Sequence, residues 1–343
     1  MKNNAPVEIL APELMSDLAQ RVYHRLLDRN LNVSYTPIEQ VQFANLEIKP
    51  YITETIRGKE VYLFAPMQRP TPNDALVSLL LTSDALKRAS ITKATFVLPM
   101  YSYARQDRKD KPRTPISARA VADLLSTNHK LERIITMDLH AAQIQGFFDF
   151  PVDNLYGSLV LAEHVRQYAQ QKGLGLSDIV VASPDLGGTE RAGLFADIIS
   201  PDVKVALFRK ERGDAANSIE RQTFIGEDVK GKTVLLIDDI ICTAGSVIKG
   251  ADKLYELGAK EVLIYATHGL FSPKDGKAAE EKLAASNAKV VITESIPRTQ
   301  EYQDQHKSWL TMLPLDDIIA RAIEESIKIG GSVSDIFPKK RKR

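Results

Sequence analysis

The pattern of hydrophobic and polar residues along the chain predicts helices and buried strands. Apolar residues recur at helical spacing between Ala11 and Leu27, at Leu14, Leu18, Val22, Leu26 and Leu27. The segment from Asn73 to Ser90, rich in leucine and alanine, predicts a second helix. Short apolar runs predict strands at residues 61–64, 94–100, 179–182, 204–208 and 234–237. The run from Val234 to Ile237 is unbroken, which is typical of a strand buried on both faces in a parallel sheet.

Two adjacent carboxylates, Asp238 and Asp239, are expected to end this last strand. The small residues from Cys242 to Ser246 then predict a turn into a helix, whose backbone N–H groups and macrodipole favour an anion. The carboxylates would accept hydrogen bonds from vicinal hydroxyls, or bind a cation carried by the ligand. This combination indicates a site for a sugar phosphate, although a strand-to-helix turn with solvated acids has the same local sequence.

The length and composition indicate a globular protein with two domains. A chain of 343 residues exceeds the usual size of one domain, and 44% hydrophobic with 26% charged residues is typical of a soluble protein. No apolar run reaches the roughly 18 residues of a membrane span. The start MKNNAPVEIL lacks the pattern of a secretory signal, and the single cysteine, Cys242, cannot form an internal disulfide. We therefore expect a reducing, cytoplasmic location without membrane contact.

The charge is concentrated at the end of the chain. The formal net charge is +1, and residues 339–343 contribute five positive charges, so the remainder carries 1 − 5 = −4. A body of this charge is not expected to bind nucleic acid. The ending PKKRKR, residues 338–343, is read as a basic tail: a nuclear-import signal, a segment that binds polyanions, or a frayed solvated terminus.

Two segments of the first half carry groups suited to a nucleotide. The stretch FANLE, Phe43 to Glu47, combines an aromatic ring, an amide and a carboxylate that could hold adenine, although an ordinary hairpin has the same composition. The densest basic stretch outside the tail follows the strand at 94–100, with Arg105, Arg108, Lys109, Lys111, Arg113 and Arg119. Its charge suits a polyphosphate, because arginine can bind phosphate oxygens bidentately. A solvated loop is the alternative.

Carboxylates and an imidazole follow the next expected strand. Asp138 and His140 are two residues apart, which places them on one face if the strand continues, and Asp149 and Asp153 come after an aromatic turn. Next to a polyphosphate these groups suggest Mg²⁺, which takes a few protein ligands together with substrate oxygens and water. A lone histidine would more often be structural, but the acids and the preceding basic loop favour a role at a site.

In the second half, the strand at 179–182 leads into SPDLGGTERAG, where Asp185 precedes a pair of glycines that would let a substrate approach the backbone. A helix-capping turn is the alternative. The strand at 204–208 is followed by RKERGDAANSIER, whose polar composition predicts a mobile, exposed loop.

Several of these motifs together resemble one family. The stretches DLHAAQIQGFFDFPVDN, YARQDRKDK followed by PISA, FANLE followed by ETIRG, SPDLGG and KER are similar to ribose-phosphate pyrophosphokinases, also called phosphoribosyl-pyrophosphate synthetases. The matches run in the family's order from about residue 8 to about residue 337. The resemblance implies an α/β fold of two phosphoribosyltransferase-like domains, each with a mainly parallel central sheet flanked by helices. They would cover residues 1–153, joined by the C-terminal segment 305–337, and residues 154–304.

The chain itself hints at this duplication, because DALKRAS precedes the strand ATFVLP as ADKLYELGA precedes EVLIYATH. The resemblance further implies a diphosphokinase: the β,γ-diphosphoryl group of MgATP passes to the anomeric hydroxyl of ribose 5-phosphate, giving 5-phosphoribosyl 1-pyrophosphate and AMP for nucleotide biosynthesis. A neighbouring subunit would supply part of the ATP site, so a homo-oligomer, of dimers assembling to a hexamer, is implied.

The roles of single residues also come from the resemblance. The positions that match the family's ATP site are Phe43, Asn45, Glu47, Arg105, Gln106 and Asp110. The metal positions are His140 and Asp185, with Asp138, Asp149 and Asp153 as further candidates for Mg²⁺. The ribose 5-phosphate positions are Asp238, Asp239, Cys242, Thr243, Ala244, Gly245 and Ser246. Lys210 and Arg212 match the two catalytic cations of a loop that closes over the reactants.

Two residues depart from the family pattern. Cys242 stands where the family usually has an acid, and Ala244 stands where it often has a glycine. These two departures favour one alternative, a non-catalytic homologue that regulates an active synthetase. The residues that oppose it are Lys210, Arg212, His140 and Asp185. A base phosphoribosyltransferase is a second alternative, but it has no need for the FANLE and DLH stretches.

Overall fold

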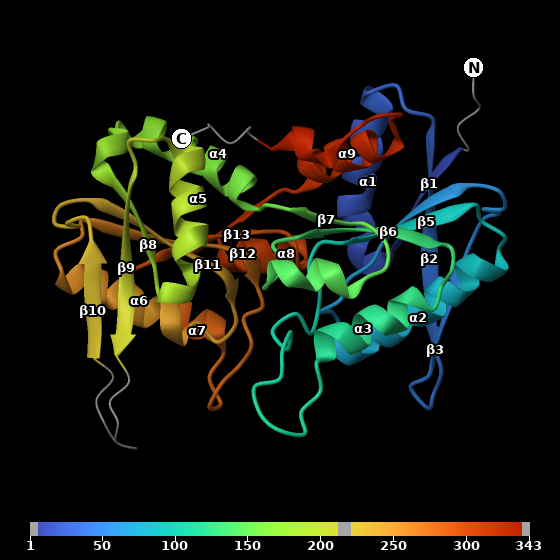
Figure 1. Ribbon diagram of the computed structural model, residues 1–343, viewed down its shortest axis with the longest axis horizontal. Coiled ribbons are helices and arrows are strands. Elements are labelled where there is room, and N and C mark those ends of the chain that lie inside the picture. The colour runs from blue at the N-terminus through green and yellow to red at the C-terminus, as the bar shows by residue number, and fades with distance from the viewer. Residues whose placement is uncertain (1–5, 212–220, 338–343) are drawn as a thin grey trace. The chain divides into compact units, whose positions relative to one another are not determined.

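The computed structural model describes residues 6–211 and 221–337, which form two compact α/β units (Figure 1). The first unit contains the chain up to Tyr156, the short segment Ser295–Pro297 and the return from Leu315 onward. The second contains Gly157–Glu294 and Arg298–Pro314. The return begins later than the expected residue 305, because residues 310–313 form a strand of the second sheet.

The first unit is built on one sheet. Its elements are β1 (Val7–Pro12), α1 (Glu13–Asp28), β2 (Val33–Gln42), β3 (Ile48–Ile52), β4 (Glu60–Phe64), α2 (Pro72–Arg88), β5 (Lys93–Leu98), α3 (Ser117–Ser126), β6 (Leu131–Met137), η1 (Ala142–Phe147), β7 (Val152–Leu155), α9 (Asp316–Ile327) and η4 (Val333–Ile336). The strands lie in the order β3-β2-β1-β4-β5-β6-β7. Among the described strands of this first sheet, only β2 and β3 pair antiparallel, as a hairpin at one edge.

The second unit repeats this plan. Its elements are α4 (Ser158–Lys172), η2 (Leu176–Asp178), β8 (Ile179–Ser183), η3 (Leu186–Gly188), α5 (Thr189–Ile199), β9 (Lys204–Glu211), β10 (Arg221–Gly226), β11 (Thr233–Ile241), α6 (Gly245–Glu256), β12 (Glu261–Gly269), α7 (Ala279–Ala284), β13 (Lys289–Thr293), α8 (Gln300–His306) and β14 (Leu310–Leu313). The strand order is β10-β9-β8-β11-β12-β13-β14, with an antiparallel hairpin of β9 and β10 at one edge.

The two sheets therefore have the same topology, since each strand of the second occupies the place of the strand seven earlier in the first. The predicted α/β fold with two mainly parallel sheets flanked by helices is confirmed. The sequence repeat fits it, because the helices α2 and α6 precede the equivalent strands β5 and β12. Within each unit, the carboxyl ends of the parallel strands meet at one edge of the sheet, where α/β proteins bind ligands.

Helix α1 packs its apolar stripe on the first sheet. Leu18, Val22 and Leu26 are buried as the spacing predicts, whereas Leu14 and Leu27 lie off the stripe and are exposed. In the described residues, no helix has the length and apolar character needed to cross a bilayer.

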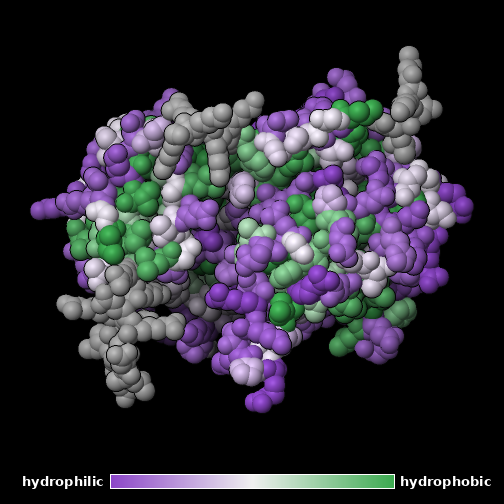
Figure 2. Space-filling model, in the orientation of Figure 1, coloured by the Kyte–Doolittle hydropathy of each residue, from purple (hydrophilic) through white to green (hydrophobic). Residues whose placement is uncertain are grey.

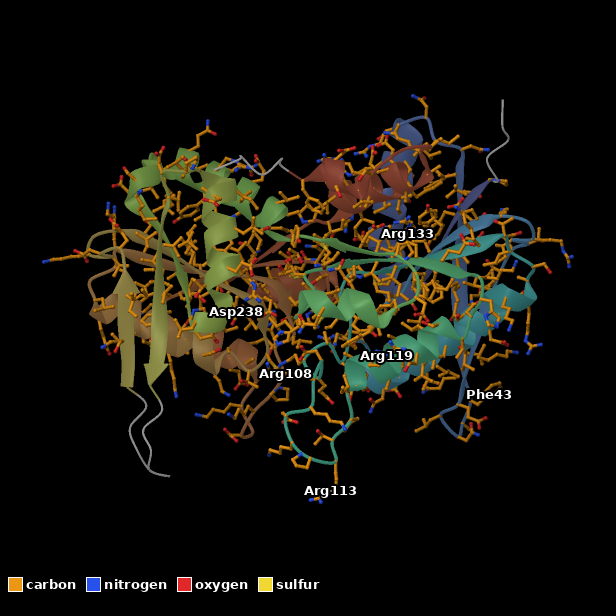
Figure 3. All side chains as sticks on the ribbon, in the orientation of Figure 1. Phe43, Arg108, Arg113, Arg119, Arg133 and Asp238 are labelled. Carbon is orange, nitrogen blue, oxygen red and sulfur yellow. The ribbon has the colours of Figure 1, made fainter. Side chains whose placement is uncertain are left out.

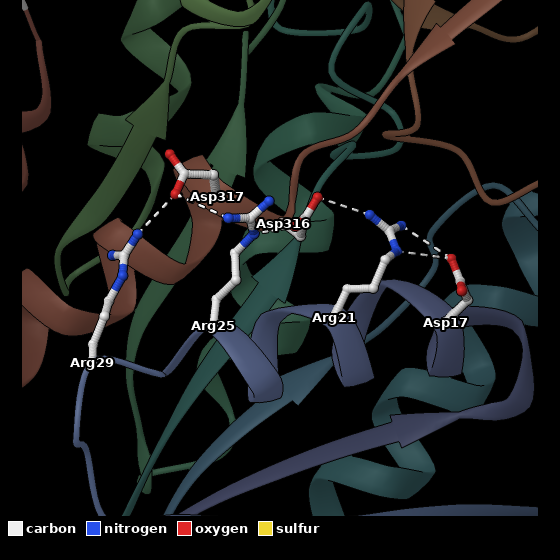
Figure 4. Close-up of polar contacts among 6 residues, drawn as sticks. All are labelled: Asp17, Arg21, Arg25, Arg29, Asp316 and Asp317. Carbon is white, nitrogen blue, oxygen red and sulfur yellow. Dashed lines mark hydrogen bonds and ion pairs between the residues drawn. The ribbon is translucent and has the colours of Figure 1, made fainter. Parts of the chain in front are cut away.

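Next to this stripe, a row of arginines one turn apart joins α1 to the returning helix α9 (Figure 4). Arg21 donates to Asp316 at 2.8 Å, and Arg25 donates to the other oxygen of the same carboxylate. Arg29 donates to the neighbouring Asp317 at 2.8 Å. Because the side chain of Asp316 is only 7% exposed, these ion pairs fasten the C-terminal segment to the first unit.

Candidate functional site

The acid pair lies inside strand β11 rather than after it. The prediction that the strand ends at Ile237 is wrong, because β11 continues to Ile241 and Ile240 pairs with His268 of β12. Asp239 is buried and Asp238 is half-buried, and the N–H of Asp239 donates to Oδ1 of Asp238 at 2.9 Å. Figure 3 labels Asp238 on this strand.

Arg191, in the first turn of α5, bridges the two carboxylates. Its Nη1 lies 3.2 Å from Oδ1 of Asp238, and its Nη2 lies 3.4 Å from Oδ2 of Asp239. Burial, followed by the hydrogen bond to Asp239 and the charge of Asp239, raises the pKa of Asp238 to about 7, and Arg191 opposes this shift. Asp238 thus holds its charge only weakly near neutral pH, and hydrogen bonds from a ligand's hydroxyl groups would stabilise its ionised form.

The role of Arg191 was missed in the sequence. One signal was available, because a cation in the first turn of a helix is unfavourable with the macrodipole and therefore suggests a carboxylate partner nearby.

The turn after β11 has the properties of an anion site. Ala244 adopts the left-handed conformation, with φ 61°, and helix α6 begins at Gly245. No atom lies within 4 Å of the place that a Cβ of Gly245 would occupy, so a ligand can approach this backbone closely. The first N–H groups of α6 have no acceptor inside the helix, and they form the positive end of the helix dipole. Cys242 and Thr243 are half-buried, and Ser246 is exposed.

Further groups converge on the same edge of the second sheet. Strands β9, β8, β11 and β12 are parallel neighbours, so their carboxyl ends lie side by side. Asp185 follows β8, and the backbone of Lys210 is near the end of β9, opposite Gln222. Strand β9 thus extends to Glu211, beyond the predicted end at Phe208, and Arg212 lies outside the described residues.

Asp185 has a local structural role of its own. Its Oδ1 accepts a hydrogen bond from the N–H of Gly188 at 3.1 Å, which caps the turn η3. Gly188 is required by packing, since a Cβ there would lie 2.3 Å from Oγ of Ser183. The capping alternative therefore describes this turn better than backbone access at Gly188. The exposed carboxylate of Asp185 still has two oxygens with which to meet a cation.

In the first unit, the basic loop between β5 and α3 is a hydrophilic projection (Figure 2), with Arg108 and Arg113 labelled on it in Figure 3. The hydroxyl of Ser117 donates to Gln106 at 2.5 Å, and the amide of Gln143 in η1 donates to Asp107 at 2.8 Å. These bonds bring the loop together with the segment after β6. The loop's predicted residues Arg105 and Asp110 are exposed.

Arg119 does not belong to that loop. It lies in α3 and pairs with Asp123 one turn further on, at 2.8 Å. Its charge is therefore matched locally, so the expectation that it adds to a polyphosphate site is not supported by its contacts.

The carboxylates after β6 differ in location and in their partners, so they do not form the single group that was predicted. The strand ends at Met137 and Asp138 has φ 36°, so Asp138 and His140 do not share the face of a strand. Asp153 lies within β7, and its carboxylate pairs with Arg133 at 2.5 Å. Asp153 thus fits a metal poorly, because its charge is already neutralised.

His140 and Asp149 are exposed, and both units contain oxygen or nitrogen donors at the ends of their strands. Within residues 6–211 and 221–337, no group of three or more His, Cys, Asp or Glu side chains is arranged to hold a metal ion. This donor set fits Mg²⁺ that takes most of its ligands from substrate phosphates and water, and it does not fit a metal enclosed by protein.

The FANLE stretch forms the tight loop of the β2–β3 hairpin. Asn45 Oδ1 accepts from the N–H of Glu47 at 3.2 Å, so this amide helps to build the turn. Phe43, labelled in Figure 3, is 46% exposed and lines a groove of about 540 Å³ beside α2. The hairpin alternative and the adenine site are both compatible with this geometry.

The paired acids and the anion-binding turn at the carboxyl edge of a doubled α/β fold define a protein of the phosphoribosyltransferase class. In agreement, the family model described as phosphoribosyl transferase domain matches residues 151–306. The model described as the N-terminal domain of ribose phosphate pyrophosphokinase matches residues 7–128. The chain belongs to the ribose-phosphate pyrophosphokinase family, as its motifs predicted.

Similar proteins cover nearly the whole chain. A ribose-phosphate pyrophosphokinase of Gloeobacter violaceus is 41% identical over 335 residues, which are 97% of this chain and 96% of the relative. One of Helicobacter hepaticus is 42% identical over 285 residues, 83% of this chain and 87% of the relative. The crystal structure of phosphoribosylpyrophosphate synthetase from Mycobacterium smegmatis superposes with a TM-score of 0.79 at 36% identity, covering 93% of this chain and 99% of that chain.

Proposed function

We propose that this chain is a ribose-phosphate diphosphokinase, which transfers the β,γ-diphosphoryl group of ATP to the anomeric hydroxyl of ribose 5-phosphate and releases AMP. The single observation that carries the proposal is the carboxylate pair bridged by Arg191, directly ahead of the α6 N-terminus. A ribose ring needs acceptors for its vicinal hydroxyls, and its 5-phosphate needs an anion site one turn away. Both lie on β11 and the turn that follows it.

The residues divide the work by their chemistry. Asp238 and Asp239 accept hydrogen bonds from the ribose 2- and 3-hydroxyls, while the amides and hydroxyls of residues 243–246 bind the 5-phosphate. Lys210 and Arg212 neutralise the charge that develops on the transferred group, because phosphoryl-type transfer is catalysed mainly by alignment and electrostatic stabilisation. Arg105, Gln106 and Asp110 hold the nucleotide, with Phe43, Asn45 and Glu47 supplied by a neighbouring copy.

Mg²⁺ is the metal that this reaction class uses, and each unit has residues that would hold it: His140 in the first unit, with Asp138 and Asp149 as further candidates, and Asp185 in the second. When bound with ATP it supplies positive charge to the phosphate oxygens. A homo-oligomer follows from the shared nucleotide site, and a cytoplasmic location from the single unpaired cysteine.

One assay separates this function from its rivals. The protein is incubated with ribose 5-phosphate, ATP, Mg²⁺ and inorganic phosphate, and AMP is followed together with 5-phosphoribosyl 1-pyrophosphate. Formation of both products supports the synthetase. Formation of neither product supports the regulatory homologue suggested by Cys242 and Ala244. Consumption of added 5-phosphoribosyl 1-pyrophosphate with a free base supports a base phosphoribosyltransferase.

A matched pair of variants ties the activity to the proposed site. Asp239→Asn removes a buried carboxylate of the acid pair and should raise KM for ribose 5-phosphate by at least about tenfold, since a charged hydrogen-bond acceptor is lost. Asp252→Asn removes an exposed carboxylate of α6 and should leave both KM values unchanged. Equal effects of the two substitutions would contradict the placement of the ribose.

A further inference from the structure

Arg298 holds the chain where it leaves strand β12. Its Nη2 donates to the carbonyl oxygens of Gly269 at 3.0 Å and Leu270 at 3.3 Å. Its guanidinium lies 4.9 Å from the ring centre of Tyr302 in α8 and 5.9 Å from that of Phe271. These contacts fasten α8 to the segment 269–271.

The same segment is bonded to the end of β11. The N–H groups of Leu270 and Phe271 both donate to the carbonyl of Ile241, at 2.9 and 3.2 Å, and the N–H of Ser272 donates to the carbonyl of Cys242 at 2.7 Å. Ile241 and Cys242 immediately precede the turn 243–246. The segment that Arg298 contacts is therefore hydrogen-bonded to the residues from which this turn begins.

The backbone of this segment is tightly constrained. Phe271 is buried with φ 52°, a conformation that a bulky residue adopts only when its surroundings enforce it. A Cβ on Gly269 would lie 2.6 Å from Cδ1 of Ile292 and 2.9 Å from the ring of Phe271. Loss of the guanidinium would remove the hydrogen bonds that hold the carbonyl groups of Gly269 and Leu270 in this constrained segment.

Stability alone does not explain an arginine at this position. Within the described residues, Nε and Nη1 of Arg298 are buried without a hydrogen-bond partner. A buried donor that lacks an acceptor is destabilising, and well-packed apolar replacements of buried charged groups are often neutral or stabilising. Besides its contacts with the rings of Tyr302 and Phe271, Arg298 contributes the orientation of the two carbonyl groups.

We propose that Arg298 is a positioning residue for ribose 5-phosphate: it fixes residues 269–272, which in turn fix the start of the phosphate-binding turn. The inference rests on the proposed function, because it assigns the 5-phosphate to residues 243–246. Arg298 lies 52 positions beyond Ser246 in the chain (298 − 246), in a segment for which the sequence suggested no role in the site.

The test compares Arg298→Met, Arg298→Lys and the control Arg166→Met. Arg166 also donates to a backbone carbonyl, that of Ile198 at 2.9 Å, but on the helices α4 and α5. For Arg298→Met we expect KM for ribose 5-phosphate to rise by about 10- to 100-fold, since a small displacement of a binding group has effects of this size. KM for ATP and the urea midpoint should stay close to those of the wild type. Arg298→Lys keeps one cationic donor and should recover part of the affinity.

Direct binding of ribose 5-phosphate by calorimetry separates the possible failures. Unchanged binding by Arg298→Met would refute the role of Arg298 alone. A lower urea midpoint, with both KM values raised together, would refute it as well, because that result describes a purely structural arginine. A wild-type protein that does not bind ribose 5-phosphate would refute the proposed function, and the role of Arg298 with it.

Discussion

Replacing Arg191 by methionine should change the pH dependence of ribose binding. The substitution keeps most of the apolar length of the side chain and removes the charge that bridges Asp238 and Asp239. Ionised Asp238 is the form that accepts a hydroxyl hydrogen bond. Because its pKa is raised to about 7, KM for ribose 5-phosphate should rise as pH falls through 7, up to about tenfold per unit.

The magnitude follows from the geometry. A cation in direct contact with a carboxylate typically lowers the pKa of that carboxyl group by about 1–3 units. Because Arg191 shares its charge between two acids, we expect it to lower the pKa of Asp238 by about 1–2 units, and this effect is absent in the variant. The pKa of Asp238 should therefore move upward in Arg191→Met. At pH 7.5 the ionised fraction of Asp238 would fall by roughly 3- to 25-fold and KM for ribose 5-phosphate would rise by the same factor, whereas near pH 9 the two proteins should converge.

The assay is the ratio of the two KM values from pH 6 to pH 9. The phosphate of the ligand titrates as well, but equally for both proteins, so its effect cancels in the ratio. Arg191→Lys, which keeps the charge without the two-pronged geometry, should fall between them. A ratio that is constant across this range would refute the argument that the charge of Arg191 acts on the acid pair.

The same shift has a consequence for stability. Between about pH 4 and pH 7 the folded protein binds more protons at Asp238 than the unfolded chain does, so the free energy of unfolding should fall as pH rises through this window. Asp238→Asn should flatten that dependence.

Three further outcomes are expected. Asp316→Asn should lower the free energy of unfolding of the first unit by about 2–3 kcal/mol in urea, because it removes the charge of a buried carboxylate that binds two arginines of α1, whereas the 52% exposed Asp317→Asn should cost less than about 1 kcal/mol. Gly245→Ala should raise KM for ribose 5-phosphate without loss of stability, since its methyl group would point into open space; Gly193→Ala, equally open, should leave KM unchanged. Lys210→Ala should lower kcat by about 100- to 1000-fold with little change in KM for ATP, and the reverse pattern would contradict a transition-state role.

The periodicity of the chain predicted the framework well, because buried strands and amphipathic helices are local properties. The apolar run at 234–237 and the helix after residue 244 were both visible, and the family motifs gave their order. The end of β11 was not visible, since the two carboxylates inside the strand contact Arg191, which is remote in sequence and reaches them in the folded unit. Local pattern carries no information on such a partner.

The contacts of single polar side chains were the least predictable part. Arg119 and Asp153 are residue types that are common in binding sites, yet each forms an ion pair with a neighbour. Arg119 pairs with Asp123 on the same helix, and Asp153 pairs with Arg133 on the adjacent strand β6. Whether a charged residue is available to a ligand depends on which neighbours the fold provides. Arg298 shows the converse, because a residue without any motif is joined to the site through backbone hydrogen bonds.

The duplicated topology indicates why the proposed ribose site would lie in one unit. Strand β4 has the place in the first sheet that β11 has in the second, but β4 ends at Phe64 and leads into Ala65, both buried in the apolar core. An apolar strand end contributes to packing and offers nothing to a hydroxyl group, whereas the acids of β11 lie beside Arg191 and carry oxygens to which a hydroxyl group could donate. In the first unit, polar groups follow β5 and β6 instead, in the basic loop and at His140. The same framework can thus present two kinds of site, because the residues at the strand ends change while the strand order is kept.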